Sequence, residues 1–239
     1  MEPITVDIWS DVVCPWCYIG KRRFDLALAD FPHRDAVRVR WRSFELQPDA
    51  PREPDIPLTQ RIQRDQEVSR DRAERIGADV TALAADIGLT YRLDLARPAN
   101  SFDAHRLLHR ADELGVGEQV RERVMAAYMG EGAVVSDHAT LTALAAEAGM
   151  DPADARALLY GDGHADTVRS DERRARSLGV TGVPTFVFNG VRGVAGAQPP
   201  DTITRLLHDA WTGADAGVGF ADGGGGGCDG DVCRTPGSA

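Results

Sequence analysis

Cys14-Pro15-Trp16-Cys17 stands at the point where a predicted strand gives way to a predicted helix. Upstream, branched aliphatic residues alternate with other residues over positions 4–9, which is the spacing of a β-strand. Downstream, apolar residues recur at helical spacings from position 17 to position 28. Pro15 suits the first turn of that helix, because its missing N–H would have no partner there. The sequence therefore predicts a Cys-x-x-Cys pair at a strand-to-helix junction.

This junction indicates which of the two cysteines is the nucleophile. Cys14 falls at the N-cap position of the helix, where unpaired backbone N–H groups and the positive end of the helix dipole favour an anion. A thiolate is such an anion, and cysteines placed in this way ionise more readily than free cysteine. Cys17 follows one turn later and is placed to close a disulfide with Cys14. We expect Cys14 to be the more exposed of the two.

Composition limits the classes of function that are open to the chain. Its 239 residues suffice for one large domain or two small ones. The net charge of −10 argues against a non-specific nucleic-acid or anionic-membrane surface, so we expect neither partner. No apolar run reaches membrane-spanning length, and no signal peptide is visible. We therefore expect a cytoplasmic protein.

The remaining pattern has strands at both ends and helices in the middle. A second strand is predicted over residues 37–43, with an arginine face that we interpret as solvated. Four prolines between residues 47 and 57 predict a loop, and residues 89–93 look extended. Strand character returns at 185–188 and 191–194 around Asn189-Gly190, a hairpin signal. Helices are expected over residues 58–76, 80–87, 101–114 (with Asn100 or Ser101 as the cap), 117–128 (ended by Gly130), 137–148 (with Ser136 as the cap), 151–160, 163–178 and 201–211.

The order β-α-β, helical insertion, β-β-α predicts an α/β protein with a thioredoxin-like core and an inserted helical domain. We expect residues 1–46 and 180–212 to form the core and residues 47–179 the insertion. Residues 213–239 form a glycine-rich tail, predicted to be flexible as far as Gly227, that carries Cys228 and Cys233. In this fold the loop before the third strand should hold a cis-proline facing the Cys-x-x-Cys. Val183-Pro184 is in the right place; the alternative is an ordinary trans proline that opens a strand.

The chain resembles the DsbA-like family, and within it the FrnE-type oxidoreductases. The resemblance covers nearly the whole chain and is carried by residues 11–21, 44–48, 99–109, 179–185 and 196–200. It implies a dithiol–disulfide oxidoreductase or isomerase that forms a mixed disulfide on Cys14, which Cys17 resolves. The implied active-site loop consists of Pro15, Trp16, Val183 and Pro184. No cofactor beyond the redox-active disulfide is implied, although glutathione could act as a reductant.

The implied partners are thiols and disulfides of proteins or small molecules. The backbone of Val183 should pair with the substrate chain. Phe102 and His105 are candidates for lining a groove above the cysteines, with core packing as the alternative. The pair Cys228-x4-Cys233 also looks like one found in part of this group. We interpret it as an auxiliary redox pair that exchanges electrons with Cys14 and Cys17; the alternative is a disordered end.

Other chemistries remain open for the same residues. Cys14 and Cys17 could be half of a zinc site, but zinc usually takes four ligands, and only the tail cysteines could supply the rest. His105 and His109 have the spacing of paired metal ligands on a helix, yet two candidates are too few, and we expect no metal. A glutathione-dependent isomerase or transferase of the same fold is an alternative, although those relatives generally carry Ser at the position of Cys14. A non-catalytic, chaperone-like binding module is another.

Overall fold

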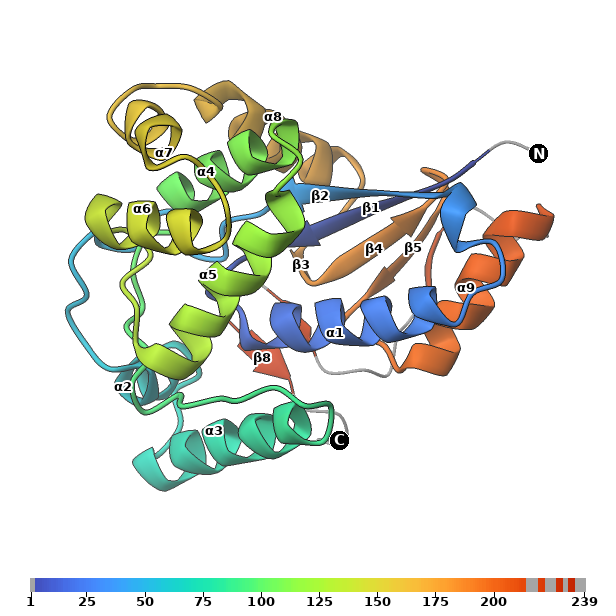
Figure 1. Ribbon diagram of the computed structural model, residues 1–239. Coiled ribbons are helices and arrows are strands. Elements are labelled where there is room, and N and C mark those ends of the chain that lie inside the picture. The colour runs from blue at the N-terminus through green and yellow to red at the C-terminus, as the bar shows by residue number, and fades with distance from the viewer. Residues whose placement is uncertain (1–2, 214–218, 222–226, 230–231, 235–239) are drawn as a thin grey trace.

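A mixed sheet forms the centre of the molecule (Figure 1). The computed structural model describes residues 3–213, 219–221, 227–229 and 232–234. In the described chain this sheet has five strands in the order β2-β1-β4-β5-β6. The central strand β1 (Ile4–Ser10) is parallel to β2 (Val37–Ser43) and antiparallel to β4 (Thr185–Phe188). The strand-helix-strand start and the later return of the chain confirm the predicted thioredoxin-like fold class.

The hairpin at the far end of the sheet forms as its sequence predicts. β4 and β5 (Arg192–Ala195) are antiparallel. Asn189 and Gly190 between them both have positive φ angles, of 49° and 73°, as the tight turn of a two-stranded hairpin requires. The side chain of Asn189 also accepts a hydrogen bond from the N–H of Thr5 at 2.9 Å, which ties this turn to β1.

Helices cover both faces of the sheet. α1 (Pro15–Ala29) and α9 (Pro200–Thr212) lie side by side along one face. A hydrophobic cluster fills the space between these helices and the strands; it includes Ile8, Phe24, Phe186 and Leu207. A short 3-10 helix, η1 (Arg34–Ala36), leads from α1 into β2. The crossover helix therefore starts at the end of β1, where the cysteine pair lies.

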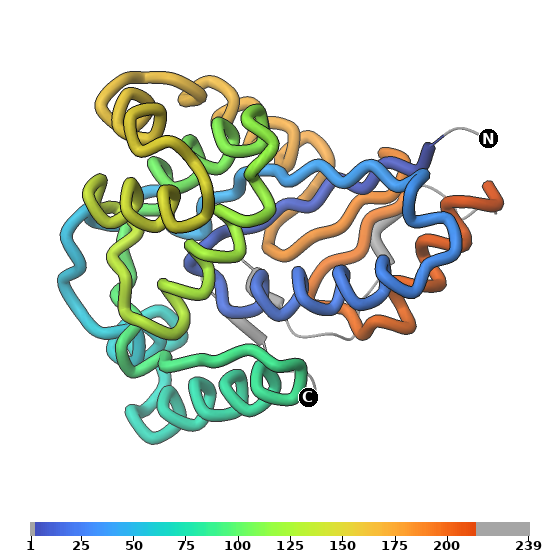
Figure 2. The backbone as a smooth tube through the Cα atoms, viewed as in Figure 1, coloured from blue at the N-terminus to red at the C-terminus, as the bar shows by residue number. Residues whose placement is uncertain are grey.

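The helical insertion follows β2 and returns to the sheet at β4 (Figure 2). Its helices are α2 (Leu58–Asp65), α3 (Arg70–Ala85), α4 (Phe102–Glu113), α5 (Gly117–Glu131), α6 (His138–Glu147), α7 (Pro152–Leu159) and α8 (Ala165–Ser177). The side chains of Ser69, Asp137 and Asp151 each accept a hydrogen bond from a first-turn N–H of the helix that follows. Such caps explain where α3, α6 and α7 begin.

Several predicted helix boundaries are wrong. The two helices expected over residues 58–76 and 80–87 are α2 and α3, and the break between them lies earlier in the chain than expected, at residues 66–69. Glu67 adopts a positive φ of 52° between them, Ser69 caps α3, and Gly77 lies inside α3 without ending it. α5 runs past Gly130 to Glu131, and Gly132 ends it with a φ of 73°. Asp137, not Ser136, caps α6. Residues 89–93 form an irregular connection and no strand.

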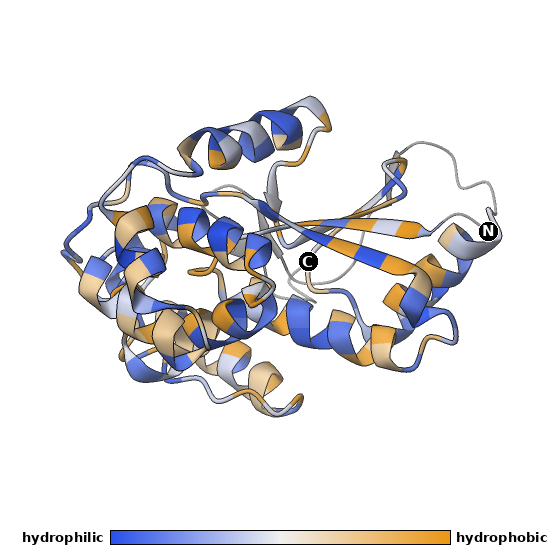
Figure 3. Cartoon of the chain, turned by 45° about the horizontal axis from the view of Figure 1, so that its top comes forward, coloured by the Kyte–Doolittle hydropathy of each residue, from blue (hydrophilic) through white to orange (hydrophobic). Residues whose placement is uncertain are grey.

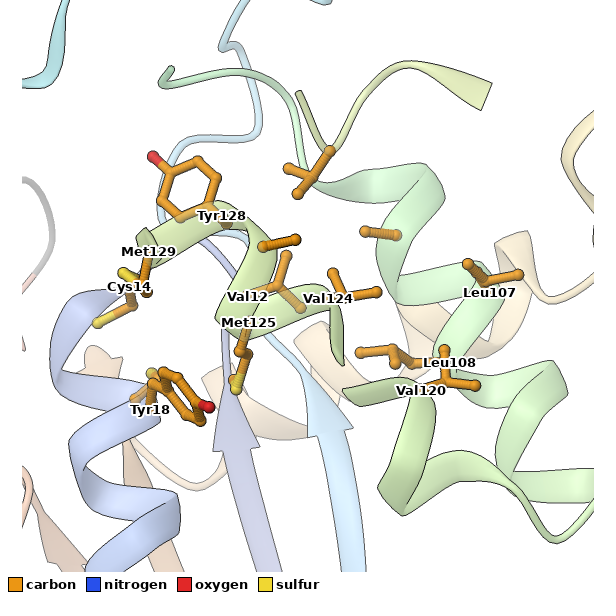
Figure 4. Close-up of a cluster of buried hydrophobic side chains, with 14 of the residues drawn as sticks. Val12, Cys14, Tyr18, Leu107, Leu108, Val120, Val124, Met125, Tyr128 and Met129 are labelled. Atoms are coloured by element: carbon orange, nitrogen blue, oxygen red, sulfur yellow. The ribbon is translucent and has the colours of Figure 1, made fainter. Parts of the chain in front are cut away.

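One buried hydrophobic cluster joins the insertion to the sheet. Apolar and polar residues alternate along the helices and strands (Figure 3), so that each helix offers an apolar face. Members of the cluster come from the start of α1 and from α4, α5, α6 and α7, among them Trp16, Leu107, Val124, Leu141 and Leu159. Figure 4 shows part of this cluster around the start of α1. The cysteine pair thus lies at the contact between the core and the insertion.

The tail takes a more ordered path than the sequence suggests. β6 (Gly219–Ala221) pairs parallel to β5, within the stretch that we predicted to be a flexible coil. β7 (Gly227–Asp229) and β8 (Val232–Arg234) form an antiparallel pair, and β7 lies antiparallel to β3 (Gly182–Val183). Exposed strand edges attract such pairing. The rest of the predicted linker lies outside the described residues, and among the described helices none is long and apolar enough to span a membrane.

Candidate active site

Helix α1 begins directly after Cys14. Cys14 occupies the N-cap position with extended backbone angles (φ −87°, ψ 115°), and Pro15 fills the first helical position. The N–H of Cys14 donates to the carbonyl of Asp11 at 3.2 Å, and the N–H of Cys17 donates to the carbonyl of Cys14 at 3.0 Å. The Cys14 residue therefore lies at the positive end of the α1 dipole, as the sequence predicts.

Val183 and Pro184 lie directly beside Cys14. The Val183–Pro184 peptide bond is cis. The Cys14 thiol donates to the carbonyl oxygen of Val183, which lies 3.7 Å from Cys14 Sγ. Gly20 lets α1 approach this loop closely, because a Cβ atom at Gly20 would lie 2.8 Å from Pro184 Cγ. The fold thus brings the cysteine pair together with the loop residues that the sequence singles out.

Both cysteines are buried as thiols. Cys14 and Cys17 are each 0% exposed, so our expectation that Cys14 is the more exposed of the two is wrong. The insertion accounts for part of the cover, since the hydroxyl of Tyr91 donates to the carbonyl of Pro15 at 2.7 Å. Tyr128 of α5 belongs to the same buried cluster as Cys14 (Figure 4). Both sulfur atoms are therefore shielded from solvent in this structure.

The surroundings of Cys17 favour its neutral thiol. Burial raises the pKa of Cys17 well above its ordinary value, and the hydrogen bond and charge of Cys14 add to the effect. The N–H of Asp11, 3.4 Å from Cys17 Sγ, and the hydroxyl of Ser10 act in the opposite direction. The net result is that Cys17 keeps its proton at neutral pH unless a base accepts it.

Asp11 connects the cysteine pair to a group of buried polar side chains. Asp11 is 0% exposed. Its Oδ1 accepts from the N–H of Val13 at 3.3 Å, and its Oδ2 accepts from the N–H of Leu46 at 2.8 Å. Nε2 of His105, on α4, lies 3.3 Å from Asp11 Oδ1. This carboxylate therefore joins the active-site loop, the segment after β2 and a helix of the insertion.

Glu45 is the second acid of this group. Its Oε2 accepts from the Arg169 guanidinium at 2.5 Å. Burial raises the pKa of Glu45 to about 7, against the opposing charges of His105 and Arg169. Burial alone would lower the pKa of His105, but its close contact with Asp11 and the charges of Asp11, Glu45 and Glu172 outweigh burial and raise that pKa. The group therefore combines an imidazole whose pKa is raised with a carboxyl group whose pKa is about 7.

Sequence reasoning did not identify Ser10, Asp11 and Glu45 as site residues. Each lies tens of residues from His105 in the chain, and only the fold brings them near it. The available signal was that Asp11, Glu45 and His105 fall within three of the segments that carry the family resemblance. That signal names segments and does not say which side chains meet.

A pocket with a volume of about 100 Å³ opens beside the active-site loop. Arg61 and Asp65 of α2 contribute charged groups to its lining. Its apolar lining comes from the active-site loop and from α2 and α3, and includes Val13, Pro15, Trp16, Leu58, Ile62, Ile76 and Val80. An apolar pocket with a few polar groups is typical of a ligand site.

The two groove candidates lie elsewhere. His105 is 3% exposed and lines a small, partly open cavity. The Phe102 ring packs under the Arg169 guanidinium, with 4.3 Å between the guanidinium carbon and the ring centre. His105 is therefore a core side chain, the half-buried Phe102 packs against Arg169, and neither lines the pocket beside the active-site loop.

The arginine face of β2 is also less solvated than expected. Arg40 and Arg42 both pair with the buried Asp7, at 2.7 Å and 2.8 Å. Arg42 pairs in addition with Asp171 at 3.0 Å. Nε2 of His109 lies 2.9 Å from the Ser43 hydroxyl, so His109 and His105 have different partners. The two histidines of α4 thus belong to separate polar groups.

The backbone pairing of the tail strands brings Cys228 and Cys233 close to the active-site loop. In the pairing of β7 with β3, Cys228 stands opposite Val183. In the pairing of β7 with β8, Cys228 stands opposite Cys233. Val183 is the residue whose carbonyl the Cys14 thiol contacts. The edge that we expected a substrate to use is therefore occupied by the chain's own tail.

Comparisons with known proteins agree with this geometry. A family model described as a DSBA-like thioredoxin domain matches residues 5–208. The uncharacterized protein YwbO of Bacillus subtilis (strain 168) is 28% identical over 208 residues, covering 86% of this chain and 96% of that protein. The crystal structure of a probable DsbA oxidoreductase from Streptomyces coelicolor is 41% identical, with a TM-score of 0.84 over 98% of this chain and 100% of that one.

A more distant structure shares the fold alone. The cytosolic disulfide reductase DsbM from Pseudomonas aeruginosa is 22% identical, with a TM-score of 0.58. The comparison covers 88% of this chain and 100% of that chain.

Proposed function

Because this chain belongs to the family of DSBA-like thioredoxin domains, we propose that it catalyses thiol–disulfide exchange through Cys14 and Cys17. The observation that carries the proposal is the cysteine pair at the N-terminus of α1, with Cys14 Sγ against the Val183 carbonyl. The similarity to an oxidoreductase structure at 41% identity supports the same class of reaction.

The reaction consists of two exchange steps. The Cys14 thiolate attacks one sulfur of a substrate disulfide, forms a mixed disulfide and releases the other substrate sulfur as a thiolate. The Cys17 thiolate then attacks Cys14 Sγ, which closes the Cys14–Cys17 disulfide and releases the second substrate thiolate. Two electrons pass from the protein to the substrate, and the reverse sequence oxidises a substrate dithiol. Isomerisation requires only that the mixed disulfide is attacked by another substrate thiol.

The substrate should bind along β3 and into the pocket beside Trp16. The pairing of β7 with β3 supports this, because it shows that the Val183 edge accepts an extended strand. The apolar lining of the pocket suits a hydrophobic side chain next to the substrate cysteine. We expect both protein disulfides and small disulfides such as oxidised glutathione to react. A cytosolic reductase among the fold relatives is compatible with the predicted cytoplasmic location.

We also propose that Cys228 and Cys233 form an auxiliary redox pair. Their register opposite one another, and that of Cys228 opposite Val183, support exchange with Cys14 and Cys17. Tethering makes this exchange intramolecular, with an effective concentration on the order of millimolar.

The proposed function is tested by insulin reduction and by reactivation of scrambled ribonuclease. Cys14→Ser should lose both activities, because no mixed disulfide can form. Unchanged activity of Cys14→Ser would contradict the proposal, and absence of both activities in the wild type would favour a binding module. If the wild type reduces insulin but does not reactivate scrambled ribonuclease, and Cys14→Ser loses insulin reduction, the protein is an oxidoreductase without isomerase activity.

A further inference from the structure

A tyrosine of the insertion makes a direct hydrogen bond to the active-site loop. Tyr91 is 5% exposed, and its hydroxyl donates to the carbonyl of Pro15 at 2.7 Å. Pro15 follows Cys14 and occupies the first position of α1. Burial raises the pKa of Tyr91 well above its ordinary value, and the charge of Cys14 adds to the effect. Tyr91 therefore keeps its proton at neutral pH and remains a donor to this carbonyl.

The backbone around Tyr91 is held against α5. The N–H of Arg92 donates to the carbonyl of Met129 at 2.7 Å. Gly130 lets the two segments approach each other, because a Cβ atom there would lie 3.0 Å from the carbonyl oxygen of Thr90. The residues on both sides of Tyr91 thus contact the end of α5. The irregular connection that follows α3 is therefore fixed at the point where its tyrosine reaches the active-site loop.

Tyr18 holds the Tyr91 ring from the side of α1. The two rings are stacked, with 6.1 Å between their centres and 16° between their planes. The Tyr18 hydroxyl donates to Glu122, on α5, at 2.6 Å. Lys21 and Arg22 pair with the same carboxylate at 2.8 Å and 2.7 Å. These contacts order the ring on which Tyr91 packs, so the position of the Tyr91 hydroxyl is set from both α1 and α5.

The Pro15–Trp16 peptide connects this hydroxyl to the nucleophile. A peptide unit is planar and trans, so its C=O and N–H point in opposite directions. The N–H of Trp16 is the first N–H of α1, because Pro15 has none, and helix geometry directs it toward the N-cap residue Cys14. A hydrogen bond to the carbonyl of a peptide polarises it and strengthens the hydrogen bonds of its N–H. The bond from Tyr91 therefore makes the Trp16 N–H a better donor to a Cys14 thiolate.

We propose that Tyr91 is a positioning residue that stabilises the reduced, thiolate form of the cysteine pair through the Pro15–Trp16 peptide. This inference rests on the proposed thiol–disulfide exchange. The Cys14–Cys17 disulfide carries no negative charge and gains less from the polarised peptide. Tyr91 therefore favours the reduced form over the oxidised form, and loss of its hydroxyl should make the pair a stronger reductant. In this way a residue of the insertion sets the redox balance of cysteines that belong to the core.

The equilibrium with glutathione measures this balance. One molecule of oxidised glutathione forms the Cys14–Cys17 disulfide and leaves as two molecules of reduced glutathione, so two electrons pass from the protein to glutathione. Tyr91→Phe should shift this equilibrium toward the protein disulfide by about three- to tenfold at pH 7, the effect of one lost hydrogen bond. For a two-electron couple this is a reduction potential lower by about 15–30 mV. Alkylation after acid quenching, followed by digestion, gives the reduced fraction of Cys14 separately from the tail cysteines.

Tyr18→Phe is the matched control. Tyr18 is 4% exposed, close to the value of Tyr91, and its hydroxyl donates to Glu122 instead of Pro15. The variant keeps the ring that stacks on Tyr91 and loses a hydroxyl of the same kind. It should therefore leave the glutathione equilibrium at the wild-type value.

Guanidinium unfolding of both redox forms separates this role from a structural one. In Tyr91→Phe the reduced form should lose more stability than the oxidised form. Equal losses in the two forms indicate a purely structural role and overturn the inference. An unchanged glutathione equilibrium in Tyr91→Phe, or an equal shift in Tyr18→Phe, also overturns it. A wild type that forms no Cys14–Cys17 disulfide at any glutathione ratio refutes the proposed function, and this inference falls with it.

Discussion

Gly20 shows how a single residue sets the geometry of the candidate site. It lies on the face of α1 that meets the loop of Val183 and Pro184. A methyl group there would come within 2.8 Å of Pro184 Cγ and 3.5 Å of the Phe186 ring. The first distance is shorter than any relaxed carbon contact, so the loop or the helix would have to move. The distance from Cys14 Sγ to the Val183 carbonyl therefore depends on the absence of a side chain at Gly20.

Gly20→Ala should destabilise the protein and slow thiol–disulfide exchange. Alanine gains about 1 kcal/mol of helix propensity over glycine, but overpacking a core contact costs roughly 1–3 kcal/mol. We expect a net loss of up to about 2 kcal/mol in the free energy of unfolding. Guanidinium unfolding measures this loss, and insulin reduction measures the activity.

Gly77→Ala is the control for stability, since Gly77 lies in the interior of α3 and a Cβ atom there meets nothing within 4 Å. It should stabilise the protein by about 0.5–1 kcal/mol. If Gly20→Ala proves as stable and as active as the wild type, close packing of α1 on Pro184 is not required by the site.

Sequence reasoning identified some residues of the candidate site and missed others. Cys14, Cys17 and Pro184 were identifiable because their chemistry requires a fixed local context: a helix N-terminus and a loop that enters a strand. Glu45 and Asp11 were not, because an acidic residue has no local signal for burial. Their environment depends on packing between segments far apart in the chain.

The element that matters most for regulation of access is the pair of strands β7 and β8. β7 takes the edge of β3 at Val183, which is the edge proposed for substrate. An antiparallel strand in that place satisfies the same backbone groups that a bound peptide would use. In the proposed binding mode the tail competes with substrate for this edge, and it also carries Cys228 and Cys233.

The double variant Cys228→Ser/Cys233→Ser tests the auxiliary pair without removing the tail. With reduced glutathione as the only reductant, re-reduction of the Cys14–Cys17 disulfide should slow by about fivefold or more, because the intramolecular route is lost. Tryptophan fluorescence follows this step, since Trp16 lies between the two cysteines.

Val232→Ser is the matched control, because it changes the same hairpin and keeps both thiols. It should re-reduce at the wild-type rate. Equal rates for the wild type and the double variant would show that the tail cysteines take no part in electron transfer.

At the scale of the whole molecule, the order of helices and strands could be predicted from the sequence. The burial of Cys14 by the insertion could not. Strand alternation, the hairpin at Asn189-Gly190 and the strong cap at Asp151-Pro152 are local signals, and the structure confirms them. The division between α2 and α3 depends on one residue with positive φ, Glu67, which has no strong sequence signal. The burial of Cys14 depends on contacts with the insertion, which no local pattern reveals.

The central claim is that Cys14 attacks substrate disulfides and Cys17 resolves the product. The most direct test is to react Cys17→Ser with a disulfide-bonded peptide, digest the product without reduction and locate the adduct by mass spectrometry. The account predicts a stable mixed disulfide on Cys14, which the wild type does not accumulate. An adduct found only on Cys228 or Cys233, or no adduct on Cys14 at any pH, would contradict it.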